Sequence, residues 1–450
     1  MRTSLLLSAL AISVCATPVL ADPLIVLRKG QPRSEISAEA SPDRSPISRG
    51  DSLPEAEAAK EAAPVAVEAR AEVPPAVNVQ NVPRPAGRRA PSTWLEASAL
   101  SWRISDGPLP LAIVTRGDSA DALPGAIGQA GTRVAFGGRG LDYGQLGGLR
   151  LTAGAWLDNE PIGVEISAFA LNQGSTSFAV RSDMNGSPGI YMPAFNVMTG
   201  AEGSLIVADP VLGYAGGVSV QSESRLHGWE ANALFAAVRA EWGDVDLLVG
   251  YRSMSLQEKL AIRNQSSDLI RGTFTDIADF FQTDNQFDGG QVGLRATRYH
   301  GNWFASVAGK IAFGPTRGSV TTNGVNRSTT PAAFFEAAPP PLPNGTFAGG
   351  FFNQPSNTGS QTQYEWSTVS ELNLRVGCDA WDCVRAFVGF DLLCWNTVAR
   401  PGDQIDRALN LTQSQVFGGG ALIGPQRPTS IFQTTDFLAS GVSAGIELRY

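Results

Sequence analysis

The chain ends with the stretch GVSAGIELRY, residues 441–450, in which apolar side chains alternate with small or polar ones. Val442, Ala444, Ile446, Leu448 and Tyr450 share one parity, and the other parity holds Ser443, Gly445, Glu447 and Arg449. This is the period of a β-strand with one apolar face. A terminal strand of this kind needs neighbours on both edges, and a closed barrel supplies them. The stretch therefore predicts the closing strand of a β-barrel.

The same alternation recurs upstream in four hairpins with tight turns at residues 158–161, 241–244, 300–302 and 378–383. An opening strand at 93–104 and the closing strand bring the number of strands to ten. Their other ends are joined by longer stretches, which we place at 104–145, 174–218, 264–283, 323–361 and 399–435. Short turns on one side and long loops on the other are typical of outer-membrane barrels. We therefore predict an all-β fold, an antiparallel up-and-down transmembrane barrel of about ten strands; apolar segments within 174–218 leave twelve as the alternative.

The composition agrees with a membrane protein that crosses the bilayer with strands. Charged residues are 17% of the chain, and the isoelectric point is near 5.0, which argues against nucleic acid as a partner. No run of 18 apolar residues follows the N-terminal segment, so a transmembrane helix is not expected. A membrane location then requires a closed set of strands.

Three regions follow from changes of character along the chain. Residues 1–21 resemble a secretory signal peptide with cleavage after Ala21; a lipoprotein signal through Cys15 is the weaker alternative, because Val14 is bulky for the preceding position. Residues 22–92 are rich in Ala, Pro and Glu and hold no aromatic residue, which predicts a disordered periplasmic tether. Residues 93–450 form the barrel, and the expected location is the outer membrane.

Aromatic residues gather near the short turns, as an interfacial girdle would require. The set is Trp94, Trp156, Trp242, Trp303, Trp381 and Tyr450. A soluble β-sandwich with a tryptophan core is the alternative. It is disfavoured because the opposite parity carries too many charges for a dry core. We expect those charges to face the lumen: Arg150, Glu165, Glu230, Arg252, Arg295, Lys310, Glu371, Arg375, Arg385, Asp391, Glu447 and Arg449.

Cys378 and Cys383 flank a predicted turn in an exported protein. Facing positions at the ends of paired strands bring β-carbons near disulfide range, so we expect a disulfide between them; two unpaired thiols are the alternative. No cysteine or histidine spacing indicates a metal site.

The block RPGDQIDR, residues 400–407, lies within a longer stretch, VARPGDQIDRALN (398–410). With RLHGWEANA, DNQFDGGQVGLR, GKIAFG and the terminal GIELRY, this stretch resembles the planctomycete-type family of outer-membrane β-barrel proteins over about residues 93–450. The resemblance implies a barrel and its location but no settled activity. As in outer-membrane barrels generally, Tyr450 is expected to act as the assembly signal read by the barrel-assembly machinery.

Candidate chemistry is sparse. Arg400, Asp403, Asp406 and Arg407 form an alternating charge cluster, which predicts a salt-bridged loop at the barrel mouth or, alternatively, a ligand or ion site at the rim, with calcium as the natural ion. His227 is the one candidate for a hydrolytic centre, although a hydrogen-bonded rim residue is the commoner role. No catalytic motif accompanies it. No cofactor is otherwise expected.

Three functions remain open from the sequence. The favoured one is a monomeric, non-enzymatic barrel with a structural, adhesive or small-solute role, whose partners are outer-membrane lipids and the assembly machinery. A narrow porin-like channel for ions or small polar solutes is the alternative. A surface hydrolase is the third.

Overall fold

The computed structural model describes residues 93–157, 161–331 and 342–450. The expected signal peptide, the expected tether and turn residues 158–160 lie outside the described residues. Within the described part, no helix is long and apolar enough to cross a membrane.

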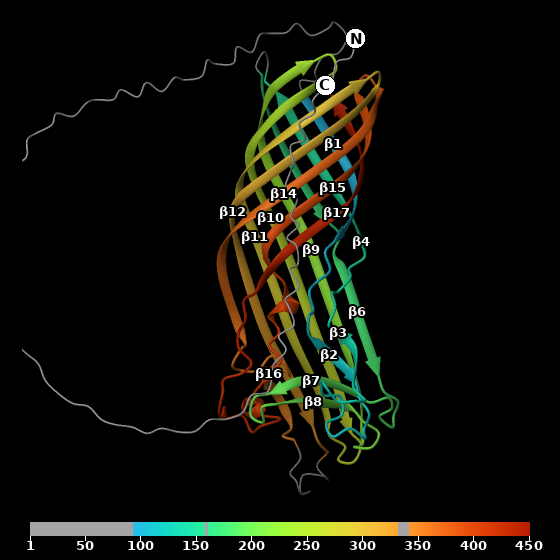
Figure 1. Ribbon diagram of the computed structural model, residues 1–450, viewed down its shortest axis with the longest axis vertical. Helices are drawn as coiled ribbons and strands as arrows, with labels where there is room; N and C mark the ends of the chain where they lie inside the picture. Colours follow the sequence, from blue (N-terminus) through green and yellow to red (C-terminus); the bar gives the residue numbers. More distant parts are fainter. Residues whose placement is uncertain (1–92, 158–160, 332–341) are drawn as a thin grey trace, which may run out of the picture. The chain divides into compact units, whose positions relative to one another are not determined.

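Ten strands close a ring in the described part of the chain, and every neighbouring pair in it is antiparallel (Figure 1). In order around the ring they are β10 (Gly243–Asp268), β11 (Phe274–His300), β12 (Trp303–Thr329), β14 (Gly359–Trp381), β15 (Val384–Ala399), β17 (Thr434–Arg449), β1 (Thr93–Ile104), β4 (Gln145–Trp156), β5 (Ile162–Leu171) and β9 (Tyr214–Ala240), with β9 returning to β10. The opening strand β1 pairs with the closing strand β17 from Trp94–Arg449 to Ile104–Ala439. The predicted barrel of about ten strands is confirmed.

Three hairpins end in two-residue turns at 241–242, 301–302 and 382–383, close to the predicted positions. We call this the short-turn end of the barrel. Gly301 has a φ of 58°, a conformation that glycine adopts without steric cost. The opposite end, where the longer connections lie, is the long-loop end.

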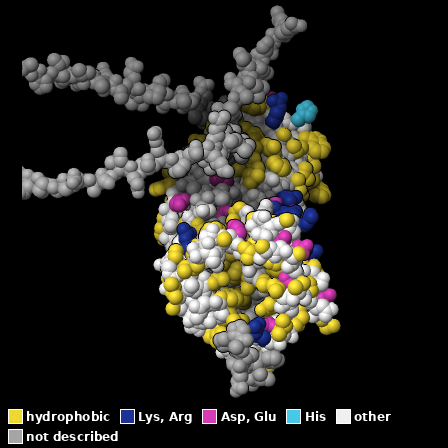
Figure 2. Space-filling model, turned by 60° about the horizontal axis from the view of Figure 1, so that its bottom comes forward, with side chains coloured by type: hydrophobic (Ala, Val, Ile, Leu, Met, Phe, Trp, Pro, Cys, Tyr) yellow, Lys and Arg dark blue, Asp and Glu magenta, His cyan; other side chains and the backbone are white. Residues whose placement is uncertain are grey.

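Outward side chains form an apolar band next to the short-turn end. On β12, Trp303, Val307, Ile311 and Phe313 are exposed, and Arg317 is the first charged outward residue beyond them. Trp303 and Phe313 are ten residues apart, which corresponds to about 26 Å along the axis of a tilted barrel and so to the height of a membrane-facing band. Figure 2 shows hydrophobic side chains gathered on this part of the wall.

Two members of the predicted aromatic girdle face inward. Trp94 and Trp156 line the lumen with ring centroids 6.3 Å apart, whereas Trp242 and Trp303 are exposed on the wall. Trp381 and Tyr450 are exposed at the short-turn end, where they also border the cavity. Trp94 lies on the inward parity of β1 with Glu96, and its partner Gly154 on β4 leaves space for the indole, since a Cβ at that glycine would lie 2.0 Å from the ring. The girdle prediction is wrong for these two residues.

The strands continue well beyond the apolar band, which the sequence did not indicate. The predicted loop 264–283 is largely strand, because β10 and β11 are separated only by residues 269–273. In this region Asp284 and Gln286 of β11 point outward while Thr283 and Asn285 point inward. Both faces are polar, so the contrast that marks a membrane strand is lost.

Loops and a second sheet fill the long-loop end. β2 (Ala112–Arg116), β3 (Arg133–Gly137), β7 (Ile190–Asn196), β8 (Ala201–Ala208) and β16 (Ala408–Leu409) form a five-stranded sheet, which we call the cap (Figure 1). Cap residues Ile113, Met192 and Val207 join one buried apolar cluster with wall residues Leu260 and Phe281. The two apolar segments suspected within 174–218 do not form one hairpin: residues 176–180 lie in β6 (Gly174–Arg181), which pairs with β9 in the wall, and residues 204–208 lie in β8, which pairs with β7 in the cap.

The remaining elements extend the wall or the loops. β6 (Gly174–Arg181) continues β5 along β9, and β13 (Gly345–Ala348) pairs with the end of β12. Two 3₁₀ helices, η2 (Pro401–Gln404) and η3 (Leu411–Gln413), lie in the connection between β15 and β17.

The orientation is testable with a native thiol. Cys383 is exposed in the turn of β14–β15, and Ile270 is exposed in the β10–β11 connection at the opposite end. If the short turns face the periplasm, an impermeant maleimide leaves the wild-type protein unlabelled in intact cells and labels it after permeabilisation. Ile270→Cys is labelled in intact cells. Labelling of Cys383 in intact cells would invert the topology.

A second prediction concerns Asp279, which lies on β11 beyond the membrane-facing part of that strand. Its carboxylate accepts N–H groups of Phe351 at 3.2 Å and Asn353 at 2.8 Å. Burial raises the pKa of Asp279 to about 7, although the N–H groups of Asn353, Phe351 and Phe352 oppose the change. Asp279 therefore binds a proton more readily when segment 349–358 is packed against it than when that segment has detached and left the carboxylate in water. Its stability is greatest below the carboxyl's ordinary pKa of 3.8 and falls as pH rises toward 7.

Amide hydrogen exchange of this segment measures the effect. After correction for intrinsic exchange, opening should increase roughly ten- to a hundredfold between pH 5 and pH 8. Asp279→Asn should flatten the dependence. An equal pH dependence in the variant would contradict the assignment.

Candidate functional site: a charged vestibule closed at its floor

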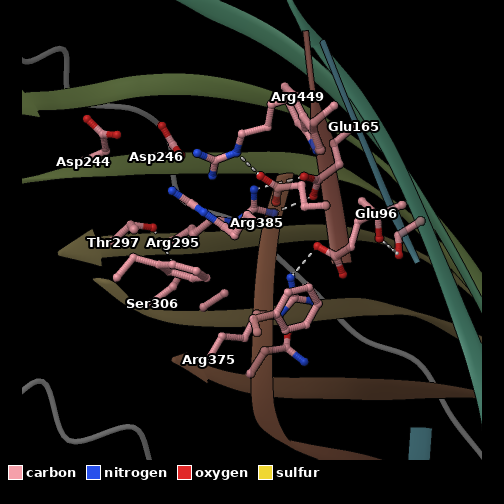
Figure 3. Close-up of a pocket in the computed structure, with 18 of the residues that line it drawn as sticks. Glu96, Glu165, Asp244, Asp246, Arg295, Thr297, Ser306, Arg375, Arg385 and Arg449 are labelled. Carbon is pink, nitrogen blue, oxygen red and sulfur yellow. Dashed lines mark hydrogen bonds and ion pairs between the residues drawn. The ribbon is translucent and has the colours of Figure 1, made fainter. Parts of the chain in front are cut away.

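The barrel encloses a cavity of about 1990 Å³, which we call the vestibule. Its lining includes the turn residues Glu241, Gly301 and Asp382, so it opens at the short-turn end. The walls come from the inward parity of the strands; Figure 3 shows side chains such as Glu96, Arg295 and Arg375 pointing into the space.

At the floor of the vestibule, buried cations and carboxylates form one network, which we call the floor network. Its acids are Glu230, Glu371 and Asp391, and its bases are Arg150, Arg252 and Lys310. Arg150 donates to Glu371 at 3.1 Å and to Asp391 at 3.0 Å. Arg252 bridges Glu230 and Glu371, and the Lys310 ammonium lies 2.7 Å from Glu230 and 3.2 Å from Glu371. The charges balance at three against three.

Neutral side chains occupy further positions around these carboxylates. Asn373 donates to Glu371 at 2.9 Å and to Asp391 at 2.6 Å, and the Trp102 indole N–H donates to Asp391 at 3.3 Å. Gln291 donates to Glu230 at 3.2 Å. Charges removed from water need this density of partners, because an unpaired buried charge costs several kcal/mol.

Above the floor network the pairs become simpler. Arg295 pairs with Glu165 at 3.0 Å, and Arg375 pairs with Glu96 at 2.7 Å. Nearer the mouth, Arg385 donates to Asp379 at 2.8 Å. All residues that the sequence assigned to the lumen lie in the barrel interior: Arg150, Glu165, Glu230, Arg252, Arg295, Lys310, Glu371, Arg375, Arg385, Asp391, Glu447 and Arg449.

Several residues of the barrel interior were not predicted from the sequence. Glu96 alternates with the outward Leu95 and Ala97, so its parity was a usable signal. Asn373 and Gln291 are uncharged and gave no such signal.

Beyond the floor network the lumen is filled by apolar side chains. Trp102, Phe287, Trp395 and Phe437 are almost fully buried there, packed with other wall residues in one cluster that we call the apolar layer. Apart from Tyr143, which precedes β4, the buried members come from β1, β4, β5, β9–β12, β14, β15 and β17, so it is mainly the wall that closes the lumen. The cap lies beyond this layer.

Within the described residues, the four side chains of the predicted rim cluster form no ion pairs with one another. Arg400 is buried and pairs with Glu258 of β10, with one nitrogen–oxygen distance of 2.9 Å. Asp406 accepts from Arg427 at 3.0 Å, and Arg407 donates to Glu202 of the cap at 3.2 Å. Burial raises the pKa of Asp403, which has no ion-pair partner within the described residues. Arg400, Asp406 and Arg407 form ion pairs with residues outside the block, as a salt-bridged loop requires, but the expectation that the four charges form one cluster is wrong.

Because these carboxylates lie apart, they do not form the calcium site that the sequence offered as an alternative. Within the described residues, no group of three or more His, Cys, Asp or Glu side chains is arranged to hold a metal ion. The Asp406 carboxylate is already engaged by Arg427 and by the N–H and hydroxyl of Thr429.

The predicted disulfide is absent, and both Cys378 and Cys383 are free thiols. The register pairs Cys378 with Ala386 and Trp381 with Val384, which places Cys383 in the turn itself. An irregularity between Asp379 and Trp381 shifts the strands, so the two cysteines do not face each other.

His227 lies on the outward face of β9, two residues from the exposed Trp229. It is paired across the sheet with Ser255 and Ala170. It therefore does not line the vestibule.

The floor network can be tested by removing one charge. Glu371→Gln leaves Arg150, Arg252 and Lys310 with too little negative charge in a buried site, and should lower the free energy of unfolding by about 3–5 kcal/mol. Glu447→Gln, near the mouth, is the matched control and should cost less than about 1 kcal/mol. Urea titrations of the detergent-refolded protein measure both. Equal losses would contradict the assigned importance of the floor network.

We compared the chain with known sequences and solved structures. No curated protein sequence matches the chain. Among solved structures, the Escherichia coli outer-membrane protease OmpT is similar at 8% identity and a TM-score of 0.37, covering 80% of this chain and 96% of that one. The Pseudomonas putida toluene transporter TodX matches at 8% identity and 0.20 (80% and 90%), and a Pseudomonas aeruginosa FadL homologue at 6% and 0.19 (80% and 89%). At these scores no role is transferred from them.

A family model matches nearly all of the described barrel. It covers residues 94–450 and is described as "Putative beta barrel porin-7 (BBP7)". The resemblance to an outer-membrane β-barrel family is thereby confirmed, with a porin-like outer-membrane fold. The chain belongs to the beta barrel porin-7 family.

Proposed function

We propose that this protein is a non-conducting, non-enzymatic outer-membrane barrel that displays its cap at the cell surface in a structural or adhesive role. The observation that carries the proposal is the sealed lumen. The vestibule ends at the floor network, and the apolar layer follows it directly. An ion on this path would cross a buried neutral network and then a layer packed with the bulky side chains of Trp102, Phe287, Trp395 and Phe437, which is costly.

The geometry of a ten-stranded ring supports this reading. Barrels near this size have interiors that side chains fill. Here Trp102 and Trp395 occupy the lumen from β1 and β15 and are completely buried. Because they belong to the wall, moving a loop does not open a path.

The cap supports an outward role for the long-loop end. Periplasmic turns are short and extracellular loops long in outer-membrane barrels, so the cap would face outward after export by the signal peptide. Strand extensions with polar outward faces would raise it above the lipid headgroups. Insertion itself would depend on Tyr450 as the assembly signal.

The alternative function, a narrow channel, is supported by the vestibule, which is polar and open at one end. It requires the apolar layer to move aside, whereas the ten strands that carry the layer are hydrogen-bonded into a closed ring. The third function, a surface hydrolase, is supported less well than the channel. His227 faces outward, away from the paired carboxylates of the lumen.

Planar-bilayer recording of the purified full mature chain tests the proposal. We expect no discrete conductance steps, while a general porin in the same bilayer conducts. The double variant Trp102→Ala with Trp395→Ala removes bulk from the apolar layer and should produce steps if it folds, which heat-modifiable electrophoretic mobility reports. Steps from the wild-type protein would overturn the proposal.

A further inference from the structure

The mouth of the vestibule carries an excess of negative charge that its interior lacks. Six carboxylates line the mouth: Glu241, Asp244, Asp246, Asp379, Asp382 and Glu447. Three cations accompany them, Arg239, Arg385 and Arg449. Six minus three leaves three negative charges. Deeper in, the charges cancel, because Arg295 pairs with Glu165, Arg375 with Glu96, and the floor network holds three of each sign.

The excess is localised on particular side chains. Arg239 forms ion pairs with both Asp244, at 3.8 Å, and Asp246. In the described part of the chain, Glu241 and Asp382 have no cation within ion-pair distance, and both are exposed at the opening. A cation that approaches the mouth therefore meets carboxylates that are not already neutralised.

A second observation lies deeper and points the same way. Glu96 is 3% exposed and lines the vestibule. Its Oε2 accepts from Arg375, but its Oε1 has no hydrogen-bond partner among residues 93–157, 161–331 and 342–450. A buried carboxylate oxygen without a donor is costly. It marks a position where an N–H group of a ligand gains a strong, charge-assisted hydrogen bond.

Aromatic faces in the vestibule already solvate cations. The guanidinium of Arg239 lies 4.9 Å from the ring centroid of Trp156, and that of Arg385 lies 4.0 Å from the ring of Phe304. Trp94, two residues before Glu96 on the same inward face, packs against Trp156. Such faces attract organic cations but not carboxylates.

We propose that the vestibule is a binding site for linear organic cations that carry ammonium or guanidinium groups and enter from the short-turn end. One charged group engages Glu96 beside Trp94 and Trp156. The other remains at the mouth with Glu241 and Asp382. A cavity of about 1990 Å³ accommodates such a molecule with its hydration water. The site goes beyond the proposed structural role and needs only an open mouth, not a sealed floor.

Titration calorimetry of the detergent-refolded full mature chain with agmatine tests the site, since this probe has a guanidinium and an ammonium group. Binding is expected in the millimolar range or tighter, weakening as salt is added, with no heat from the dianion succinate. Glu96→Gln should weaken binding about tenfold, and Glu241→Gln with Asp382→Asn about fivefold. Glu223→Gln, on the outward face of β9, makes the same charge change outside the vestibule and should have no effect.

The variants also guard against misfolding. Glu96→Gln disturbs the pair with Arg375, whereas the double variant at the mouth touches only exposed side chains, so a folding defect in the first leaves the second informative. Absence of agmatine binding, preference for succinate, or equal affinity in the wild type and both vestibule variants would overturn the proposal. None of these outcomes depends on conductance, so this test and that of the sealed lumen fail separately.

Discussion

The ion pairs around Glu371 are the interaction on which the interior of this barrel depends. Ten strands enclose a lumen so narrow that inward side chains from opposite walls touch. Arg150 of β4 reaches Glu371 of β14, and Arg252 of β10 reaches it from another side. Because a buried charge without a partner costs several kcal/mol, each inward charge on one strand requires a counter-charge on another. Register and charge placement are therefore coupled around the ring.

Along its axis, the lumen is divided into the open vestibule, the floor network and the apolar layer. Toward the short-turn end, ion pairs such as Arg295–Glu165 and Arg375–Glu96 lie around the open vestibule. At the floor network the charges are satisfied by one another and by amides such as Asn373. Past that level no water is needed, and Trp102, Trp395 and their neighbours pack as in a soluble core. The cap extends that core, with Ile113 and Met192 packed against wall residues such as Leu260.

The part of the fold that touches lipid could be predicted from the sequence, because lipid imposes a one-sided pattern. Residues 93–104 and the turns at 301–302 and 382–383 were placed closely for this reason. The extensions of β10 and β11 were not, since water lies on the outer face and polar groups such as Asn285 lie on the inner one. Parity places Trp94 on the inward face with Glu96, whereas its position near a turn suggested a girdle. Gly154 supplies the space that the indole occupies there, and only the register of β1 on β4 reveals that space.

The distinctive block at 400–407 shows why an alternating charge pattern need not form a site. Arg400 enters the barrel interior, where Glu258 and the ring of Phe437 surround it, and its guanidinium lies 5.4 Å from that ring centroid. Arg407 is drawn instead to Glu202 on the cap, and Asp406 to Arg427 in the following loop. Three of the four charges thus pair with residues outside the block, on β10, on the cap and in the following loop, because the block crosses from the wall to the cap within a few residues. Glu258, the partner that fixes the first of these ties, lies on a strand extension with no lipid-facing pattern. The block is therefore best understood as a set of ties that hold the cap on the barrel, whose partners the sequence alone could not supply.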